Sequence, residues 1–178
     1  MKTGFQMYAA VTAFAALHFA AAAAAEPRSP TPIAAQAAFE KLKGLAGEWR
    51  GTEGEKGKGS EVMVLYKTTA NGSAVMETLF PGTDHEMVTL YHMDGDKLIL
   101  THYCAVGNQP KMALTSKSTA DELGFDFAGG TNFKPAEDMH MHGLRIRFEG
   151  KDAIATEWDL FQSGKKVDTK KFFFSRKA

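Results

Sequence analysis

The chain has 178 residues, with 21 basic and 21 acidic side chains and one cysteine. This balance of charge argues against nucleic acid or an anionic membrane surface as a partner. One cysteine cannot form an internal disulfide, so packing alone must hold the fold together.

Residues 1–25 have the features of a secretory signal peptide. Lys2 supplies the positive start, residues 5–19 are mostly apolar, and residues 23–25 are alanines that suit a cleavage site. A transmembrane anchor is the alternative, but the apolar stretch is short and interrupted by polar residues. We therefore expect a mature domain over residues 26–178, located in the periplasm or outside the cell and not inserted in a membrane.

A short amphipathic helix is expected next. Thr31 and Pro32 suit a helix start, because the hydroxyl can cap free N–H groups and proline lacks one. Apolar residues then recur at helical spacing until Gly44 or Gly47 ends the pattern: Ala35, Ala38, Phe39, Leu42 and Ala46. We expect this helix to cover one end of the domain.

The segment from residue 52 to 60 contains three glycines and four charged residues. Such a segment cannot pack a core and is expected to be a mobile loop. It is either a solvated hairpin tip or a lid over an open end.

Short runs with period-2 alternation fill the rest of the chain, separated by Gly, Asn and Asp turns. With the strand around Trp49 they make about ten strands, at residues 62–66, 73–80, 87–93, 97–105, 111–117, 123–128, 140–148, 154–161 and 167–176. This pattern predicts an all-β fold, an antiparallel up-and-down β-barrel that closes its own edges.

Asn71-Gly72 is the strongest hairpin signal, because both positions tolerate a positive φ. A two-residue loop there places Tyr66 opposite Glu77 and Val64 opposite Leu79. Glu77 then shares a face with apolar residues. That face points either outward or into the lumen, and an inward carboxyl group would need a partner or a ligand.

Asp94-Gly95 is a second hairpin signal. A two-residue loop there pairs Tyr91 with Leu98 and Met87 with His102, so His102 shares the inward face of Leu98. We therefore predict that Glu77 and His102 anchor a ligand in the lumen, with Tyr66 and Tyr91 beside them.

Two more histidines lie on the strand at 140–148. His140 and His142 share the alternation of Leu144, whereas Arg145 and Arg147 occupy the opposite, solvent-facing positions. The histidines are either hydrogen-bonded rim residues or part of a functional cluster near that rim. Cys104 is expected to be inaccessible, since a free thiol would otherwise oxidise outside the cytoplasm.

Gly47-Glu48-Trp49 resembles the first-strand motif of the calycins, the superfamily of lipocalins and fatty-acid-binding proteins. Their last strand carries an arginine that packs on this tryptophan, and Arg176 stands at the matching position here. The resemblance implies that Trp49 is buried at a closed end with Arg176 stacked on it. The lipocalin Thr-Asp-Tyr motif is absent.

The chain is more similar to uncharacterised secreted bacterial domains with a lipocalin-like barrel. The runs at 45–49 and 100–110 look like their signature, and the second run contains Asn108, a further candidate ligand contact. This resemblance implies a fold but no activity. Related barrels, the nitrobindins, bind haem through one histidine.

The sequence thus predicts a barrel that binds a small, mostly apolar molecule, with no catalytic residues and no metal site assigned. A haem or metal site is the alternative, and its candidate ligands are His85, His102, Cys104, His140 and His142. A small enzyme with a Glu77–His102 acid–base pair is a third possibility. No cofactor is assigned beyond the possible haem, and no oligomeric state is indicated.

Overall fold

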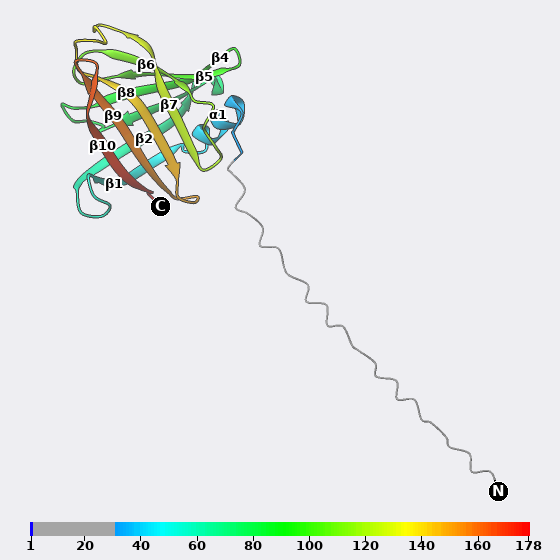
Figure 1. The fold of residues 1–178 in the computed structure, drawn as a ribbon. Helices are drawn as coiled ribbons and strands as arrows, with labels where there is room; N and C mark the ends of the chain where they lie inside the picture. The colour runs from blue at the N-terminus through cyan, green and yellow to red at the C-terminus, as the bar shows by residue number, and fades with distance from the viewer. Residues whose placement is uncertain (2–30) are drawn as a thin grey trace.

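The structure is a computed structural model that describes Met1 and residues 31–178. The predicted signal peptide and the first residues of the predicted mature domain lie outside this range. Within it, one α-helix, α1 (Ala35–Lys43), precedes ten strands (Figure 1). The strands are β1 (Gly47–Glu53), β2 (Ser60–Thr69), β3 (Ala74–Leu79), β4 (Met87–Asp94), β5 (Lys97–Tyr103), β6 (Gln109–Leu114), β7 (Glu122–Thr131), β8 (His140–Phe148), β9 (Ala153–Gln162) and β10 (Lys165–Arg176).

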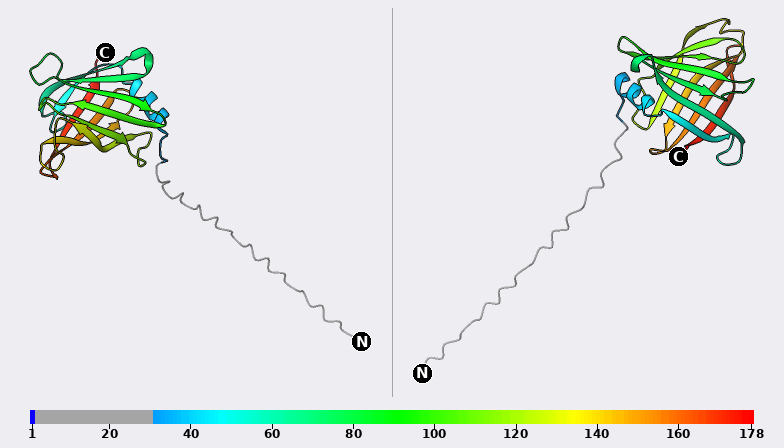
Figure 2. Two further views of the ribbon diagram at one scale, coloured as in Figure 1. Left: turned by 90° about the horizontal axis from the view of Figure 1, so that it is seen from above. Right: turned by 180° about the vertical axis from the view of Figure 1, so that it is seen from behind.

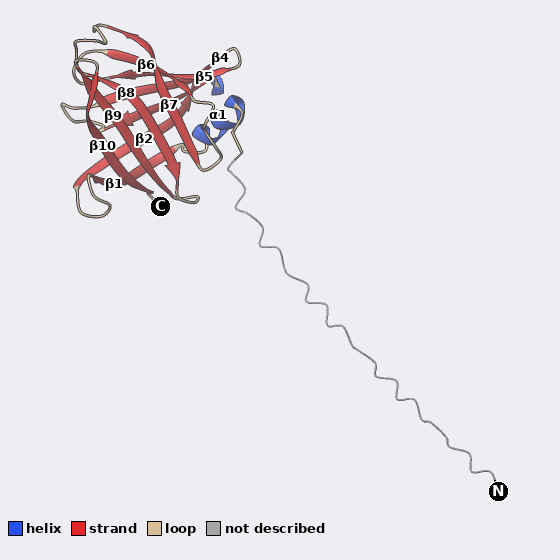
Figure 3. Cartoon of the chain, viewed as in Figure 1, coloured by secondary structure: helices blue, strands red, loops and turns tan. Residues whose placement is uncertain are grey.

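The strands form one closed barrel in which each strand is antiparallel to the next in sequence. Pairing of β10 with β1, from Trp49 opposite Arg176 to Glu53 opposite Phe172, completes the ring. The views in Figure 2 show the sheet curving round on itself, and Figure 3 shows the strands joined by loops, with the helix at one end. Closure leaves no unpaired strand edge. The predicted all-β, up-and-down barrel is confirmed.

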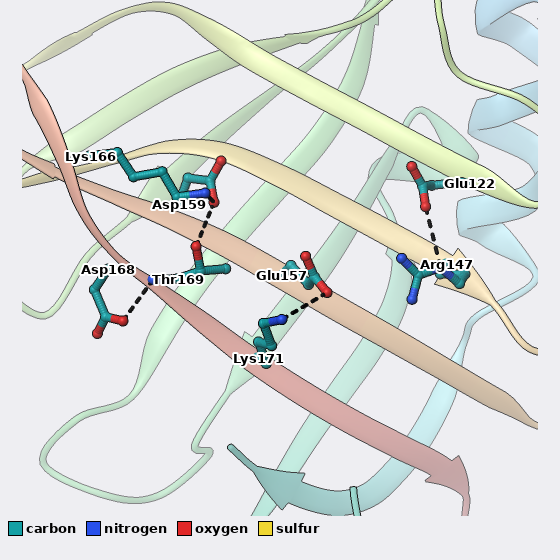
Figure 4. Close-up of polar contacts among 8 residues, drawn as sticks. All are labelled: Glu122, Arg147, Glu157, Asp159, Lys166, Asp168, Thr169 and Lys171. Carbon is teal, nitrogen blue, oxygen red and sulfur yellow. Dashed lines mark hydrogen bonds and ion pairs between the residues drawn. The ribbon is translucent and has the colours of Figure 1, made fainter. Parts of the chain in front are cut away.

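Alternation along the strands separates the core from the solvent. On β8, Leu144 and Ile146 are buried while Arg145 and Arg147 are exposed, as predicted. The outer face carries cross-strand ion pairs, such as the one between Arg147 and Glu122 at 3.3 Å (Figure 4). Exposed pairs of this kind contribute roughly 0–1 kcal/mol each, so the apolar interior supplies most of the stability.

The helix begins later than predicted. Thr31 does not cap it, since α1 starts at Ala35 and its N-cap residue, Ala34, makes no side-chain hydrogen bond. The preceding residues are extended instead: Pro32 bridges to Thr119, and the Ile33 N–H donates to the Ser118 carbonyl oxygen at 2.8 Å. Pairing with the loop between β6 and β7 therefore displaces the helix start.

The apolar stripe of α1 covers one end of the barrel, as predicted. Ala38, Phe39 and Leu42 are buried in the core, and the helix contacts β2, β4 and β5. In both views of Figure 2, α1 lies at the same end of the barrel. Among the described residues, no helix is both long and apolar enough to cross a bilayer.

Trp49 and Arg176 meet beside α1. The Trp49 side chain is 0% exposed, and its Nε1–H donates to the Leu45 carbonyl oxygen at 2.8 Å. The Arg176 guanidinium carbon lies 4.2 Å from the centre of the Trp49 ring. The predicted stacking is confirmed, and the two residues mark the closed end of the barrel.

The first predicted hairpin register is correct. Tyr66 pairs with Glu77 and Val64 with Leu79. The pairing stops at Thr69 and Ala74, where a tight turn contains Asn71 with a φ of 52°.

The second predicted register is wrong by two residues. Asp94 pairs with Lys97, so Gly95 and Asp96 form the loop, and Tyr91 pairs with Leu100 rather than Leu98. Gly95 has a φ of 61°, which suits the first position of such a turn. Because a shift of two preserves alternation, the predicted inward face is still correct.

Candidate ligand-binding site

A cavity of about 540 Å³ opens at the end of the barrel away from Trp49. It lies where β1 ends at Glu53 and β3 ends at Leu79, whereas Trp49 lies near the start of β1. Its wall is mostly apolar and comes from β3, β4, β8, β9 and β10: Leu79, Met87, Met141, Trp158, Leu160 and Phe172. The exposed mouth includes Thr83, His85 and Val106.

His102 is a polar group in this apolar wall. Its side chain is 2% exposed and lies near the end of β5. Nδ1 lies 2.9 Å from the Thr89 hydroxyl oxygen, whereas Nε2 is buried without a hydrogen-bond partner in the structure. The ring packs 4.7 Å from the ring of Trp158 across the barrel. His102 therefore lines the cavity with a ring that has one nitrogen without a protein partner.

Burial lowers the pKa of His102 from 6.5 to about 4. A buried imidazole without a nearby carboxylate is more stable when it is neutral. At neutral pH the ring therefore carries one proton, on either Nδ1 or Nε2. In that form Nε2 can either donate or accept a hydrogen bond, or bind a metal ion.

The strand registers place four polar side chains in one row across the inside of the barrel. Tyr66 on β2 pairs with Glu77 on β3, Glu77 pairs with Thr89 on β4, and Thr89 pairs with His102 on β5. Partner residues in antiparallel strands point to the same face, so the row is continuous. Thr89 separates Glu77 from His102.

Glu77 lies deeper in the core than the cavity. It is 4% exposed, and the Tyr91 hydroxyl donates to its Oε2 at 2.6 Å. Burial raises the pKa of Glu77 from 4.5 to about 7, while the Tyr91 hydroxyl and then Tyr66 oppose that rise. The Tyr66 hydroxyl acts on this carboxyl without a hydrogen bond of good geometry. Among the described residues, the cavity wall does not include Glu77, Tyr66 or Tyr91.

His140 and His142 belong to a separate aromatic cluster at the rim. The His142 ring is stacked between Phe127, 4.6 Å away, and Phe161, 3.9 Å away. His140 is fully buried, lines part of the cavity and lies 4.7 Å from Phe133. The two histidines are hydrogen-bonded at the rim, which is one of the two arrangements that the sequence left open, the other being a functional cluster.

Both nitrogens of His140 are engaged within this cluster. Nδ1 lies 2.9 Å from the Asp138 carbonyl oxygen, which can only accept, so Nδ1 carries the proton. Nε2 then accepts from the Nδ1–H of His142, 2.9 Å away. Burial, followed by the proximity of His140, lowers the pKa of His142, which favours this neutral arrangement.

A β-bulge between Met141 and Gly143 interrupts the predicted alternation on β8. It leaves His142 without a partner on β9 and pairs Met141 with Leu160, both of which line the cavity. A bulge adds one residue to one strand and redirects side chains, and no residue in this segment signals it clearly. Met141 is therefore a cavity residue that the sequence analysis missed.

Asn108 and Cys104 lie in the connection between β5 and β6, at the same rim. Asn108 is buried, its Nδ2 donates to the Met139 carbonyl oxygen at 2.7 Å, and its Oδ1 has no partner. Cys104 follows the end of β5 and lines the cavity, 4.0 Å from the sulfur of Met87. Contrary to the prediction, the Cys104 side chain is only partly buried, because the strand ends at Tyr103.

Two further site residues escaped the sequence analysis. Thr89 contacts His102 only in the corrected register, since the predicted one paired Met87 with His102. Trp158 reaches His102 across the lumen from β9, and no local pattern reveals such a long-range contact.

Among residues 31–178, no three His, Cys, Asp or Glu side chains come together in a group suited to a metal ion. No protein-family model matches the chain, and no curated protein matches it. The class of protein therefore comes from the structure itself: a closed, ten-stranded antiparallel β-barrel whose cavity could hold a ligand.

Proposed function

We propose that this protein binds a small, mostly apolar molecule in the barrel cavity, with Nε2 of His102 as the innermost polar contact. The observation that carries the proposal is a buried ring nitrogen without a partner on His102, which lines a mostly apolar wall. Small-molecule sites commonly combine such a wall with a few polar groups that fix orientation. The likeness of Gly47–Trp49 and Arg176 to the calycin motif supports the same function, since calycin barrels hold ligands in their lumen.

The signal-like segment at residues 1–25 supports a place of action in the periplasm or outside the cell. There the protein would sequester or carry its ligand without a membrane anchor. Fractionation of the expressing cells tests this part independently: recovery only in the cytoplasm, at full length, would contradict it.

Native mass spectrometry of gently purified protein tests the binding function. We expect a retained small molecule on the wild-type protein and less of it on His102→Leu, which removes the nitrogen but keeps an apolar side chain. His92→Leu is the matched control, because His92 lies on β4 and does not line the cavity. Equal retention by all three proteins would show that His102 is not the contact. Absence of any mass increase, even after incubation with apolar compounds, would argue against the function itself.

Binding of haem iron through His102 is the second candidate. The chemistry of the donor fits, because a neutral histidine that ligates a metal usually donates its other ring N–H to a neighbouring oxygen. Here Nδ1 would donate to the Thr89 hydroxyl oxygen, 2.9 Å away. Haem would add its own redox and gas-binding chemistry to the pocket. A Soret band of added haemin that shifts and intensifies with the wild-type protein, but not with His102→Leu, would favour this candidate.

A further inference from the structure

Thr89 is buried beside His102 and determines what that histidine can offer a ligand. The Thr89 side chain is 1% exposed. In the described part of the chain, the one hydrogen bond of its hydroxyl group is the 2.9 Å contact with Nδ1 of His102. A threonine hydroxyl has one proton to donate, and leaving a buried donor unused is costly.

Two arrangements of protons are compatible with the contact. If Nδ1 carries the imidazole proton, Nδ1–H donates to Thr89 and the hydroxyl proton of Thr89 is left without an acceptor. If Nε2 carries it, the Thr89 hydroxyl donates to Nδ1, and both groups are satisfied. Each arrangement thus leaves one donor without a protein acceptor, the Thr89 hydroxyl in the first and Nε2–H in the second. Because His102 lines the cavity and Thr89 does not, a bound ligand can accept only from Nε2–H, which favours the second arrangement.

We propose that Thr89 holds His102 in the Nε2–H form, so that the cavity selects neutral ligands carrying a hydrogen-bond acceptor, such as a ketone, aldehyde or ester carbonyl. The inference rests on the proposed function and names the ligand class for the same site. The acceptor group enters first, and the apolar remainder packs against Trp158, Leu79 and Phe172.

The same geometry disfavours other polar groups. A carboxylate would lose its water and receive one hydrogen bond from a neutral ring, which does not offset the cost of burying a charge. Lys170 on β10 also lines the cavity, but its ammonium group is already paired with Asp168 at 2.8 Å rather than with a ligand. A protonated amine has no acceptor to offer Nε2–H. A ligand without any acceptor leaves that donor unpaired.

The tautomer is tested on the wild-type protein by measuring the ¹⁵N chemical shifts of the His102 ring. We expect a protonated Nε2 and an unprotonated Nδ1 at pH 7. Thr89→Val removes the hydroxyl but keeps the shape of the side chain, and it should move the Nδ1 signal toward that of an unprotonated ring nitrogen without a hydrogen bond. Thr89→Ser keeps the hydroxyl and should preserve the wild-type signals. A wild-type ring protonated at Nδ1 would overturn the proposal and favour the haem candidate.

Ligand selection is tested with 2-heptanone, heptane and heptanoate, which share a seven-carbon chain. Binding is followed by the fluorescence of Trp158, which lines the cavity. We expect His102→Leu to weaken the binding of 2-heptanone by about tenfold, which is the value of one hydrogen bond. The same substitution should leave the binding of heptane nearly unchanged. His102→Gln, which keeps a donor, should lose less, and heptanoate should bind more weakly than the ketone to wild type.

The outcomes separate this inference from the proposed function. If the ketone and the alkane respond equally to His102→Leu, the cavity binds apolar molecules but does not select an acceptor. Tighter binding of heptanoate than of 2-heptanone would overturn the selection of neutral ligands. If none of the three compounds binds, the proposed function itself fails.

Discussion

The Arg176 guanidinium makes several contacts at the closed end of the barrel. Besides stacking on Trp49, its Nη1 donates to the Ala46 carbonyl oxygen and its Nη2 to the Gly44 carbonyl oxygen, both at 2.8 Å. The side chain thus ties the last strand to the residues that follow α1. Only a planar guanidinium can satisfy two carbonyl groups while stacking on an indole.

Arg176→Lys should therefore destabilise the fold although it keeps the charge. We expect a loss of about 1–2 kcal/mol in the free energy of unfolding, measured with urea. Arg147→Lys is the control, because Arg147 makes an exposed ion pair on the outer face and should change stability by less than about 0.5 kcal/mol. Equal effects of the two substitutions would contradict the role of Arg176.

The two buried ionisable residues of the polar row should respond to pH in opposite directions. Burial raises the pKa of Glu77 to about 7 and lowers that of His102 to about 4. The stability contributed by neutral Glu77 is complete below pH 4.5 and is lost as the pH rises toward 7. The stability contributed by neutral His102 is complete above pH 6.5 and is lost as the pH falls toward 4.

A variant that lacks one of these two residues should show only the pH dependence of stability that the other residue causes. As the pH rises from 4 to 6.5, Glu77→Gln should become more stable, because it keeps His102. As the pH rises from 4.5 to 7, His102→Gln should become less stable, because it keeps Glu77. Each change in the free energy of unfolding should be roughly 3 kcal/mol. Chemical unfolding at a series of pH values gives both slopes. If each variant keeps the pH profile of the wild-type protein, neither group has the shifted pKa that its burial requires.

At the level of elements, β8 shows where alternation ceases to predict a site. The sequence correctly places Leu144 inward and Arg145 outward, but the bulge before Gly143 redirects His142 and brings Met141 to the cavity. Hairpin turns predict faces well, because an error of two residues preserves alternation. An error of two residues does, however, change which residues lie opposite each other on neighbouring strands. The contact of Thr89 with His102 is therefore seen only in the observed register.

The connection between β7 and β8 should loosen in acid. Its Asp138 carbonyl accepts from His140, and His140 accepts from His142, whose pKa is lowered by burial. Burial disfavours the charged form of His142, so protonation of this ring at Nε2 favours opening of the cluster, although Asp126 and Asp159 near His142 favour its charge. Asp159 is in turn paired with Lys166.

Hydrogen exchange measures this loosening directly. We expect faster exchange over residues 132–139 as the pH falls below 6.5, after correction for intrinsic rates. His142→Phe keeps an aromatic ring between Phe127 and Phe161 but removes the hydrogen bond to His140, so its exchange should be fast at both pH values. A wild-type segment whose corrected protection is the same at pH 5 and pH 7.5 would contradict this role of the histidines.

At the scale of the whole molecule, the sequence predicted the closed barrel, its strand number and its closed end. Those features depend on local alternation, turn residues and one motif. The cavity was harder to predict, because its wall joins residues from opposite sides of the barrel, such as His102 and Trp158. Glu77, Tyr66 and Tyr91 were correctly placed on inward faces, yet they lie in packed core beneath the cavity rather than along its wall.

The two tryptophans provide the most direct test of the central claim. Trp158 lines the cavity beside His102, while Trp49 is buried at the closed end under Arg176. In a ¹H–¹⁵N spectrum of the protein titrated with 2-heptanone, we predict that the indole signal of Trp158 shifts and saturates while that of Trp49 stays in place. Movement of the Trp49 signal alone, or of neither signal, would contradict ligand binding at the His102 cavity.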